Sequence, residues 1–155
     1  LSKEMAELHR QGVRIRVIGE RGRLDGDIVA LIEQSEKLTE NNVTLNLTLA
    51  LSYGGRNAIV LAARRLAEQV KAGTLEPEMI GEEQFTSHLE TVDIPDPDLL
   101  IRTSGEKRIS NFMLWECAYS EFVFIDTLWP DFSREQFGDA IAEFARRIRR
   151  YGSTV

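Results

Sequence analysis

An apolar, strand-like run leads directly into the stretch Ile101-Arg102-Thr103-Ser104-Gly105-Glu106-Lys107-Arg108-Ile109-Ser110-Asn111-Phe112. Its two arginines stand six positions apart, with a glycine between them and a serine after them. A diphosphate offers several anionic oxygens, and two guanidinium groups can each bind them through paired, charge-assisted hydrogen bonds. The glycine lets the backbone approach an anion closely, and a helix opening at Asn111 would point its free amides at that anion. The stretch therefore predicts a strand-to-helix turn that binds diphosphate.

A solvated surface turn is the alternative explanation for the same residues. In that case the arginines form ion pairs with nearby carboxylates, Glu106 and Asp98, and bind no ligand. The spacing of the arginines alone does not separate the two explanations.

Strand and helix patterns alternate through the rest of the chain. The clearest strand is the run from Val43 to Leu51, in which apolar residues alternate with Thr, Asn, Ala and Ser. The last helix is expected to begin after Ser133, a good N-cap residue. The patterns predict strands at residues 13–18, 43–51, 98–101 and 122–125, and helices at the start of the chain and at residues 27–38, 57–71, 82–89, 111–119 and 134–151.

This alternation predicts an α/β fold with a mainly parallel β-sheet flanked by helices on both faces. In such sheets ligands bind outside the carboxyl ends of the strands, which is where the turn after Arg102 falls. The chain shows no internal repeat or convincing linker, so residues 1–155 are expected to form a single domain.

The composition is that of a soluble globular protein, with 43% hydrophobic and 28% charged residues among 155. A net charge of −6 argues against a general nucleic-acid surface, so any anion must be held by a local basic site. The sequence contains neither a long apolar span nor an export signal, and we expect a cytoplasmic location. The single cysteine, Cys117, has no disulfide partner and is expected to be buried in a helix.

The chain continues as Asn111-Phe112-Met113-Leu114-Trp115-Glu116-Cys117-Ala118-Tyr119-Ser120-Glu121, and later as Leu128-Trp129-Pro130-Asp131-Phe132. Together with the opening stretch, this resembles the C-terminal signature of the cis-prenyltransferases, the undecaprenyl diphosphate synthase family. In that signature, I-R-T-S/G-G-E-x-R-x-S-N-F precedes a W-x-x-x-Y-x-E helix and a W-P-D-F turn. Residues 13–19, 45–47 and 53–56 also resemble this family, so the similarity covers almost the whole chain.

The resemblance implies a set of residues that bind the substrate diphosphate. These are Arg102, Arg108, Ile109 and Ser110, joined by Arg150 and Gly152 of an R-x-G ending that reaches across a homodimer. Leu45 matches a bulky position near the far end of the tunnel that holds the growing hydrocarbon chain. Packing of an ordinary core would give Leu45 the same apolar character, and composition does not distinguish the two.

Glu121 is implied to be a Mg2+ ligand, which could serve the other subunit's site. A hard cation that bridges diphosphate oxygens needs oxygen ligands of this type. The alternative is a salt bridge between Glu121 and a nearby arginine.

The resemblance further implies a transferase that condenses isopentenyl diphosphate onto an allylic diphosphate, such as farnesyl diphosphate, in successive cis additions. The expected product is a long-chain polyprenyl diphosphate, namely undecaprenyl diphosphate. The enzyme is expected to associate peripherally with the membrane and to deliver this lipid to it.

One departure from the family concerns the catalytic residues. The M-D-G-N-G-R-W stretch, which carries the catalytic aspartate, and the S-x-E-N-W stretch do not occur between Leu1 and Val155. We therefore expect this sequence to be the C-terminal part of a longer domain whose N-terminal part is missing, with no catalytic residue of its own and no activity alone. Two alternatives stay open: a non-catalytic partner subunit of a heteromeric cis-prenyltransferase, and an anion-binding module without prenyl chemistry.

Overall fold

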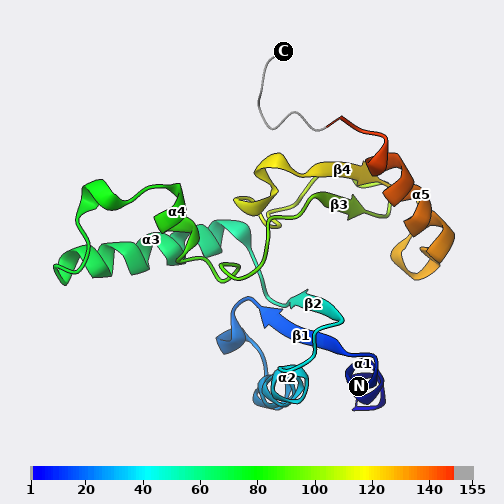
Figure 1. Ribbon diagram of the computed structural model, residues 1–155, viewed down its shortest axis with the longest axis horizontal. Helices are drawn as coiled ribbons and strands as arrows, with labels where there is room; N and C mark the ends of the chain where they lie inside the picture. The colour runs from blue at the N-terminus through cyan, green and yellow to red at the C-terminus, as the bar shows by residue number, and fades with distance from the viewer. Residues whose placement is uncertain (1, 149–155) are drawn as a thin grey trace. The chain divides into compact units, whose positions relative to one another are not determined.

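The computed structural model describes residues 2–148 of the chain (Figure 1). The chain divides into two compact units, residues 1–92 and residues 93–155, and each is described by itself. The expectation of a single domain over residues 1–155 stays a prediction.

The first unit contains two parallel strands and four α-helices, with two short 3-10 helices labelled η. In chain order these are α1 (Ser2–Arg10), β1 (Val13–Ile18), η1 (Arg21–Arg23), α2 (Gly26–Thr39), β2 (Leu45–Ala50), α3 (Gly55–Lys71), η2 (Pro77–Met79) and α4 (Glu82–Thr86). The second unit holds β3 (Leu99–Arg102), η3 (Glu116–Tyr119), β4 (Glu121–Phe124), η4 (Trp129–Asp131) and α5 (Arg134–Ala145).

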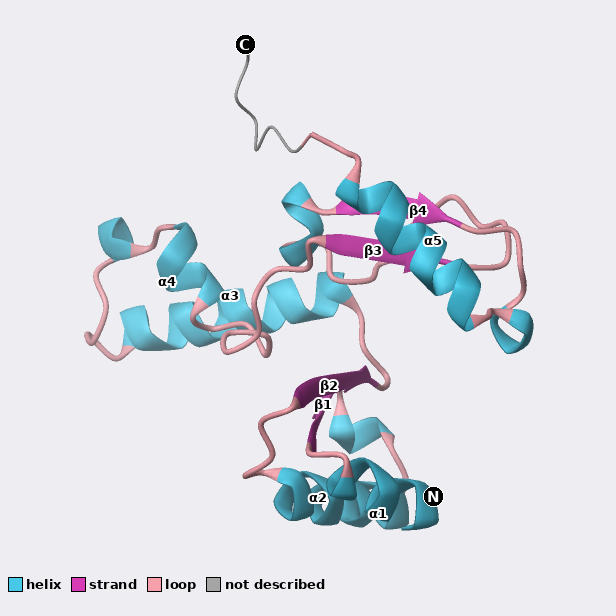
Figure 2. Ribbon diagram, turned by 45° about the vertical axis from the view of Figure 1, so that its right-hand side comes forward, coloured by secondary structure: helices cyan, strands magenta, loops and turns pink. Residues whose placement is uncertain are grey.

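Strands β1 and β2 pair in parallel, in a register that runs from Val13 opposite Leu45 to Ile18 opposite Ala50. Val13, Ile15 and Val17 alternate along β1 and are all buried, as the period of two in a strand requires. Helices α1 and α2 both contact β1 and lie on the same side of the strand pair (Figures 1 and 2). One part of the core of this unit therefore lies between β1 and these two helices, and Ala62 and Leu66 on α3 and Leu89 after α4 are buried as well.

The edge of β1 that faces away from β2 is closed by side chains. Thr39 Oγ1 accepts a hydrogen bond from the Ile15 amide at 3.0 Å, and Glu36 Oε1 accepts one from the Val17 amide at 2.9 Å. Glu90 Oε2 accepts a third from the Gly19 amide at 2.9 Å. Because the outward amides of Ile15, Val17 and Gly19 have side-chain acceptors, this part of the edge is poorly suited to pair with another strand.

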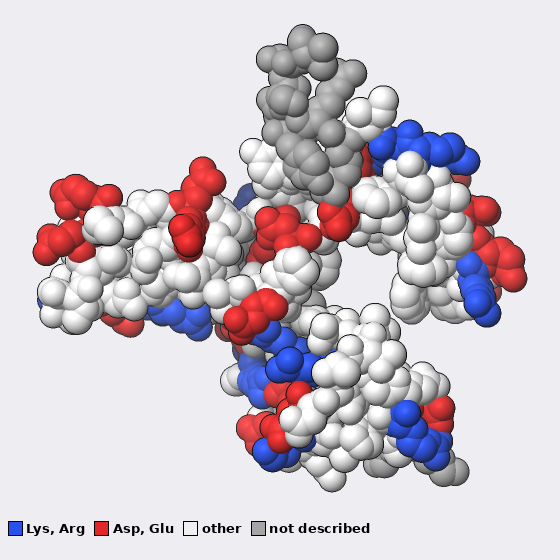
Figure 3. Space-filling model, viewed as in Figure 1, with Lys and Arg blue, Asp and Glu red and all other residues white. Residues whose placement is uncertain are grey.

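Glycines set both ends of α3. Gly54 is the N-cap in an extended conformation, and Gly73 follows the C-terminal end with a φ of 70°, a left-handed value that glycine adopts at little cost. Helix α4 packs against α3. Exposed glutamates around η2 and the start of α4 form an acidic surface in Figure 3 and comprise Glu76, Glu78, Glu82 and Glu83.

In the second unit, β3 and β4 pair in parallel from Leu99 opposite Glu121 to Arg102 opposite Phe124, and α5 packs on β4. Ser133 caps α5, since its side chain accepts from the Gln136 amide and the Gln136 side chain accepts from the Ser133 amide. The α/β class, the parallel pairing and the Ser133 cap were all predicted from the sequence and are confirmed.

Three helix predictions need correction. The helix expected at residues 111–119 is wrong, because Ser110, Asn111 and Met113 have positive φ values of 47°, 65° and 44° and cannot belong to a right-handed helix. Only η3 forms in that segment. Helix α4 ends at Thr86 rather than residue 89, and α5 ends at Ala145 within the described part of the helix expected at 134–151.

Candidate functional site

Arg102 is the last residue of β3, and its side chain is directed to the loop that follows. Its Nη1 donates to the Arg108 carbonyl oxygen at 2.6 Å and to Ser110 Oγ at 3.0 Å. Both acceptors are neutral oxygens, so these bonds orient the guanidinium group without compensating its charge. The structure thus brings together Arg102 and Ser110, two of the residues that the sequence predicted to bind diphosphate.

The loop around these residues has an unusual backbone. Ser104 and Gly105 have φ values of 70° and 67°, and Ser110 and Asn111 also have positive φ. The Ser104 amide donates to the Thr127 carbonyl at 2.8 Å, and the Gly105 amide donates to the Ile125 carbonyl at 3.0 Å, so the loop is fastened to the segment after β4. Sparsely populated backbone conformations that the surroundings hold in place are frequent at ligand-binding sites.

Arg108 forms an ion pair with Glu106, and its side chain is 62% exposed. The alternative explanation of the stretch, a surface turn with paired arginines, thus applies to Arg108 in this structure. An exposed pair of this kind contributes little to stability, so Arg108 can exchange Glu106 for a stronger anion. Ile109 is half-buried, and its carbonyl oxygen accepts a hydrogen bond from the Phe112 amide at 3.0 Å. This hydrogen bond closes a turn at the place where the sequence predicted a helix to begin at Asn111.

Glu121 is the first residue of β4 and pairs with Arg147 beyond the end of α5. Arg147 Nη1 donates to Glu121 Oε2 at 2.8 Å, and Arg147 Nη2 pairs with Glu143. The hydrogen bond to Glu121 raises the pKa of Arg147 most, and the hydrogen bond to Glu143 raises it further. The salt bridge that the sequence left open as an alternative for Glu121 is therefore present.

Glu121 and Arg102 lie at opposite ends of the second strand pair. Glu121 is opposite Leu99 in the register, three residues before Arg102. With a rise of about 3.3 Å per residue, this places the two positions about 10 Å apart along the strands. The register therefore separates the backbone positions of Glu121 and Arg102 along the strands.

The residues that the structure describes contain no group of three or more His, Cys, Asp or Glu side chains that could hold a metal ion. Mg2+ is commonly held by one or two carboxylates together with substrate phosphates. Glu121 fits such a site as a single hard ligand, with the other oxygens supplied by a diphosphate. Arg150 and Gly152, also predicted to bind the diphosphate, lie outside the described residues.

A second polar cluster surrounds Cys117, which is buried as predicted, although in a 3-10 helix. Burial raises the pKa of the Cys117 thiol, a hydrogen bond with Ser120 partly offsets this increase, and the Glu116 and Asp96 carboxylates raise the pKa further. Asp96 is an exposed residue, and partial desolvation of its carboxyl group raises its pKa, with a further increase from the negative charge of Glu116. These groups belong to the segments before β3 and before β4, at the end of the strand pair away from the Arg102 loop.

In the first unit, Leu45 begins β2 and is 58% exposed, and Leu49 on the same side of the strand is 42% exposed.

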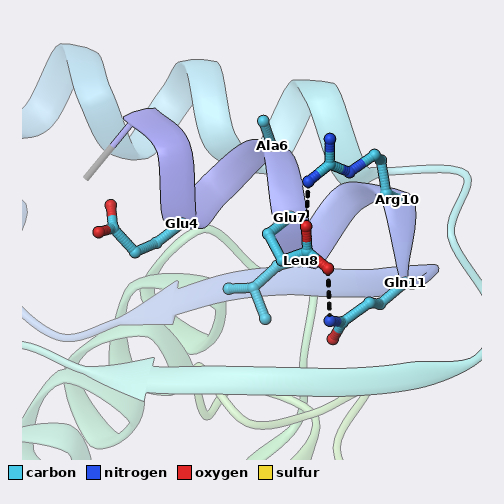
Figure 4. A pocket seen from close by; sticks show the side chains of 6 residues that line it. All are labelled: Glu4, Ala6, Glu7, Leu8, Arg10 and Gln11. Carbon is cyan, nitrogen blue, oxygen red and sulfur yellow. Dashed lines mark hydrogen bonds and ion pairs between the residues drawn. The ribbon is translucent and has the colours of Figure 1, made fainter.

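A cavity of about 600 Å³ opens at the carboxyl end of β1 and is lined by Arg16, Arg21, Glu36, Arg65 and Glu90 among others. A second hollow of about 690 Å³ lies along α1, where Glu7 pairs with Arg10 and accepts from Gln11 at 2.7 Å (Figure 4). Among the residues that the structure describes, Leu45, Arg102, Arg108, Ile109 and Ser110 line neither of these two cavities.

Arg147 is the residue in this region that the sequence did not identify. It stands in the run Arg146-Arg147-Ile148-Arg149-Arg150, which has the character of a solvated, basic helix end. Because 26 positions separate Arg147 from Glu121, no local pattern indicates which arginine of the run reaches that carboxylate.

No helix among residues 2–148 has the combination of length and apolar character needed to cross a membrane.

Comparisons with known proteins agree with these observations. A family model described as "Putative undecaprenyl diphosphate synthase" matches residues 1–152. The isoprenyl transferase 2 of Bradyrhizobium diazoefficiens is 50% identical over 155 residues, which are 100% of this chain and 62% of that protein. The chain spans about three fifths of the length of the first curated relatives that it matches, at 62%, 62% and 60%.

Two solved structures share the fold. Lavandulyl diphosphate synthase from Lavandula x intermedia, in complex with dimethylallyl diphosphate, is 39% identical with a TM-score of 0.95, and the match covers 98% of this chain and 66% of that chain. A probable undecaprenyl diphosphate synthase from Campylobacter jejuni is 35% identical with a TM-score of 0.84, covering 98% and 69% respectively. The resemblance and the fold inferred from the sequence are therefore confirmed.

Proposed function

Because this chain belongs to the undecaprenyl diphosphate synthase family, we propose that the protein it comes from is a cis-prenyltransferase. It condenses isopentenyl diphosphate onto an allylic diphosphate, of which farnesyl diphosphate is the proposed primer, in successive cis additions. Inorganic diphosphate leaves at each step, and the proposed product is undecaprenyl diphosphate. The curated relatives named isoprenyl transferase and the two diphosphate synthase structures support this reaction class.

The observation that carries the proposal is the hydrogen bond from Arg102 to Ser110 in a loop with a constrained backbone. In the proposed complex, Arg102, Arg108 and Ser110 bind the diphosphate of isopentenyl diphosphate, and Ile109 packs beside it. Arg150 and Gly152 complete the set. Their contribution is to hold the alkene toward the allylic carbon and to neutralise the diphosphate charge, not to react themselves.

Glu121 is proposed to contribute one carboxylate to a Mg2+ site. Bound Mg2+ would supply Lewis-acid stabilisation of the charge on the departing diphosphate. Since Glu121 and Arg102 occupy opposite ends of their strand pair, we assign Glu121 to the site of a second copy in a homodimer. Leu45, exposed on β2, is proposed to line the tunnel for the hydrocarbon chain. The protein is proposed to work in the cytoplasm at the membrane surface, where its lipid product is delivered.

The direct test is incorporation of radiolabelled isopentenyl diphosphate with farnesyl diphosphate and Mg2+. It is run on this 155-residue chain and on the protein with the upstream sequence of its gene. We expect incorporation only with the upstream sequence, and chromatography of the product then gives its chain length. Omission of Mg2+ and addition of a chelator are the matched controls, and both are expected to abolish incorporation.

Absence of incorporation in both forms would contradict the proposal. Mixing the inactive protein with a catalytic family member would then test the alternative of a non-catalytic partner subunit. Gain of activity on mixing would identify the chain as that subunit.

A further inference from the structure

Arg147 lies between two carboxylates that belong to different elements of the second unit. Its Nη1 contacts Glu121 at the start of β4 at 2.8 Å, and its Nη2 contacts Glu143 on α5. The side chains of Arg147 and Glu121 are each 29% exposed, and that of Glu143 is 47% exposed. The guanidinium group thus bridges the two elements, and all three charges are partly shielded from water.

The position of Arg147 has a consequence for the carboxylate that it holds. A divalent cation on Glu121 would have a guanidinium charge within a few ångströms, and like charges at that distance repel each other strongly outside bulk water. The two cations therefore compete for one carboxylate. Glu143 provides a way to resolve the competition, because Arg147 keeps an ion-pair partner there when it leaves Glu121.

The backbone at the end of α5 permits this movement. The helix ends at Ala145, and the Arg146 and Arg147 amides donate to the carbonyls of Glu143 and Phe144 in a final tight turn. Arg147 lies beyond the regular helix and already contacts Glu143, so its side chain can leave Glu121 and keep that second contact without disrupting helical hydrogen bonds.

We propose that Arg147 and a divalent cation bind the Glu121 carboxylate alternately, and that Glu143 retains Arg147 while the cation is bound. This inference rests on the proposed role of Glu121 as a metal ligand. Arg147 is then a positioning residue: it keeps Glu121 in place before the metal and diphosphate arrive, and it sets how tightly they bind.

The test measures binding of Mn2+ by electron paramagnetic resonance. The sample is the protein with its upstream sequence and isopentenyl diphosphate, without an allylic substrate, so that no turnover occurs. Arg147→Gln is expected to tighten Mn2+ binding about two- to fivefold, the range that corresponds to loss of a partly exposed ion pair. Glu143→Gln is expected to weaken it, because Arg147 then has Glu121 as its remaining carboxylate.

Arg146→Gln is the matched control, since it removes the same charge one position earlier from an exposed side chain. It is expected to change Mn2+ binding less than Arg147→Gln does. Circular dichroism checks that each variant folds. If Arg147→Gln does not fold, Arg147→Lys keeps the charge but lacks the two separate nitrogens that contact Glu121 and Glu143, and a smaller tightening is expected from it.

Unchanged or weaker Mn2+ binding in Arg147→Gln, or an effect equal to that of Arg146→Gln, would overturn the exchange. The metal assignment is tested separately with Glu121→Gln, which is expected to lower Mn2+ affinity. If Glu121→Gln lowers the affinity and Arg147→Gln has no effect, the exchange fails and the proposed function stands. If the protein does not incorporate isopentenyl diphosphate at all, the proposed function fails whatever the Mn2+ data show.

Discussion

Arg102 and Ser110 are joined by a hydrogen bond of 3.0 Å between Nη1 and Oγ, although eight positions separate them in the sequence. The same guanidinium group bonds the Arg108 carbonyl at 2.6 Å. The loop between the two residues is therefore closed by the first residue that is predicted to bind the substrate. A guanidinium group fixed in this way loses less side-chain entropy when it binds a diphosphate.

Replacement of Arg102 by alanine should weaken use of isopentenyl diphosphate in the protein with its upstream sequence. A hydrogen bond to a charged group contributes about 1.5–3 kcal/mol, so we expect kcat/KM for isopentenyl diphosphate to fall by about ten- to a hundredfold. Steady-state kinetics at saturating farnesyl diphosphate measures this. Lys107→Ala, which removes an exposed cation from the same loop, is the matched control and should have a much smaller effect. Equal effects of the two substitutions would remove the specific role of Arg102.

The sequence predicted the strands and the Arg102 loop because their signals are local. Alternation in β1, the cap at Ser133 and the spacing from Arg102 to Ser110 are each contained in a few residues. The helix at residues 111–119 was predicted from a helix start at Asn111 and from the resemblance to the family signature, neither of which reveals the positive φ values at Asn111 and Met113. Two interactions join segments that are distant in the sequence, so only the folded chain identifies them. They are the ion pair of Arg147 with Glu121 and the hydrogen bond from the Val17 amide to Glu36.

Glu36 should contribute measurably to the stability of the first unit. Its carboxylate accepts from the Val17 amide at 2.9 Å and from Arg21 Nη2 at 2.7 and 2.8 Å. Glu36→Ala leaves a partly buried amide without this acceptor, and we expect unfolding to require about 1–3 kcal/mol less free energy. Urea denaturation followed by circular dichroism measures the change.

Two further variants separate the contributions at this position. Glu36→Gln retains an oxygen for the Val17 amide but loses the charged pair with Arg21, so its effect should be smaller than that of Glu36→Ala. Glu33→Ala removes an exposed carboxylate from the same helix and controls for helix propensity. If Glu36→Ala were no more destabilising than Glu33→Ala, the closed edge of β1 would not contribute to stability.

Gly19 occupies a position that no other residue can fill without strain. Its φ is 112°, and an added Cβ would lie 2.0 Å from the Leu51 carbonyl oxygen. We expect Gly19→Ala to cost about 3 kcal/mol or more, since backbone strain and steric overlap each cost about 1–3 kcal/mol. Gly22→Ala is the control, because an added Cβ there meets nothing within 4 Å. Thermal unfolding of both variants checks this, and similar melting temperatures would show that the backbone at Leu51, just after β2, moves to make room for the added Cβ.

Asp96 should make the stability of the protein depend on pH. Partial desolvation and the charge of Glu116 raise the pKa of Asp96 in the folded state, so the unfolded chain loses this proton first as the pH rises. The folded state then binds more protons than the unfolded state, and stability falls as the pH rises through the window between the unfolded and folded pKa values. Asp96→Asn removes this loss. Its melting temperature should exceed that of the wild type by about 1–2 °C above the window, and the difference should shrink below it.

Asp139→Asn removes an exposed carboxylate from α5 in the same unit and controls for the change in net charge. The melting temperatures of Asp96→Asn and the wild type could also differ by the same amount from acid to neutral pH. That result would show that ionisation of the Asp96 carboxyl group does not cause the difference. Glu116, whose charge contributes to the raised pKa of Asp96, is 4% exposed, so little water screens that charge.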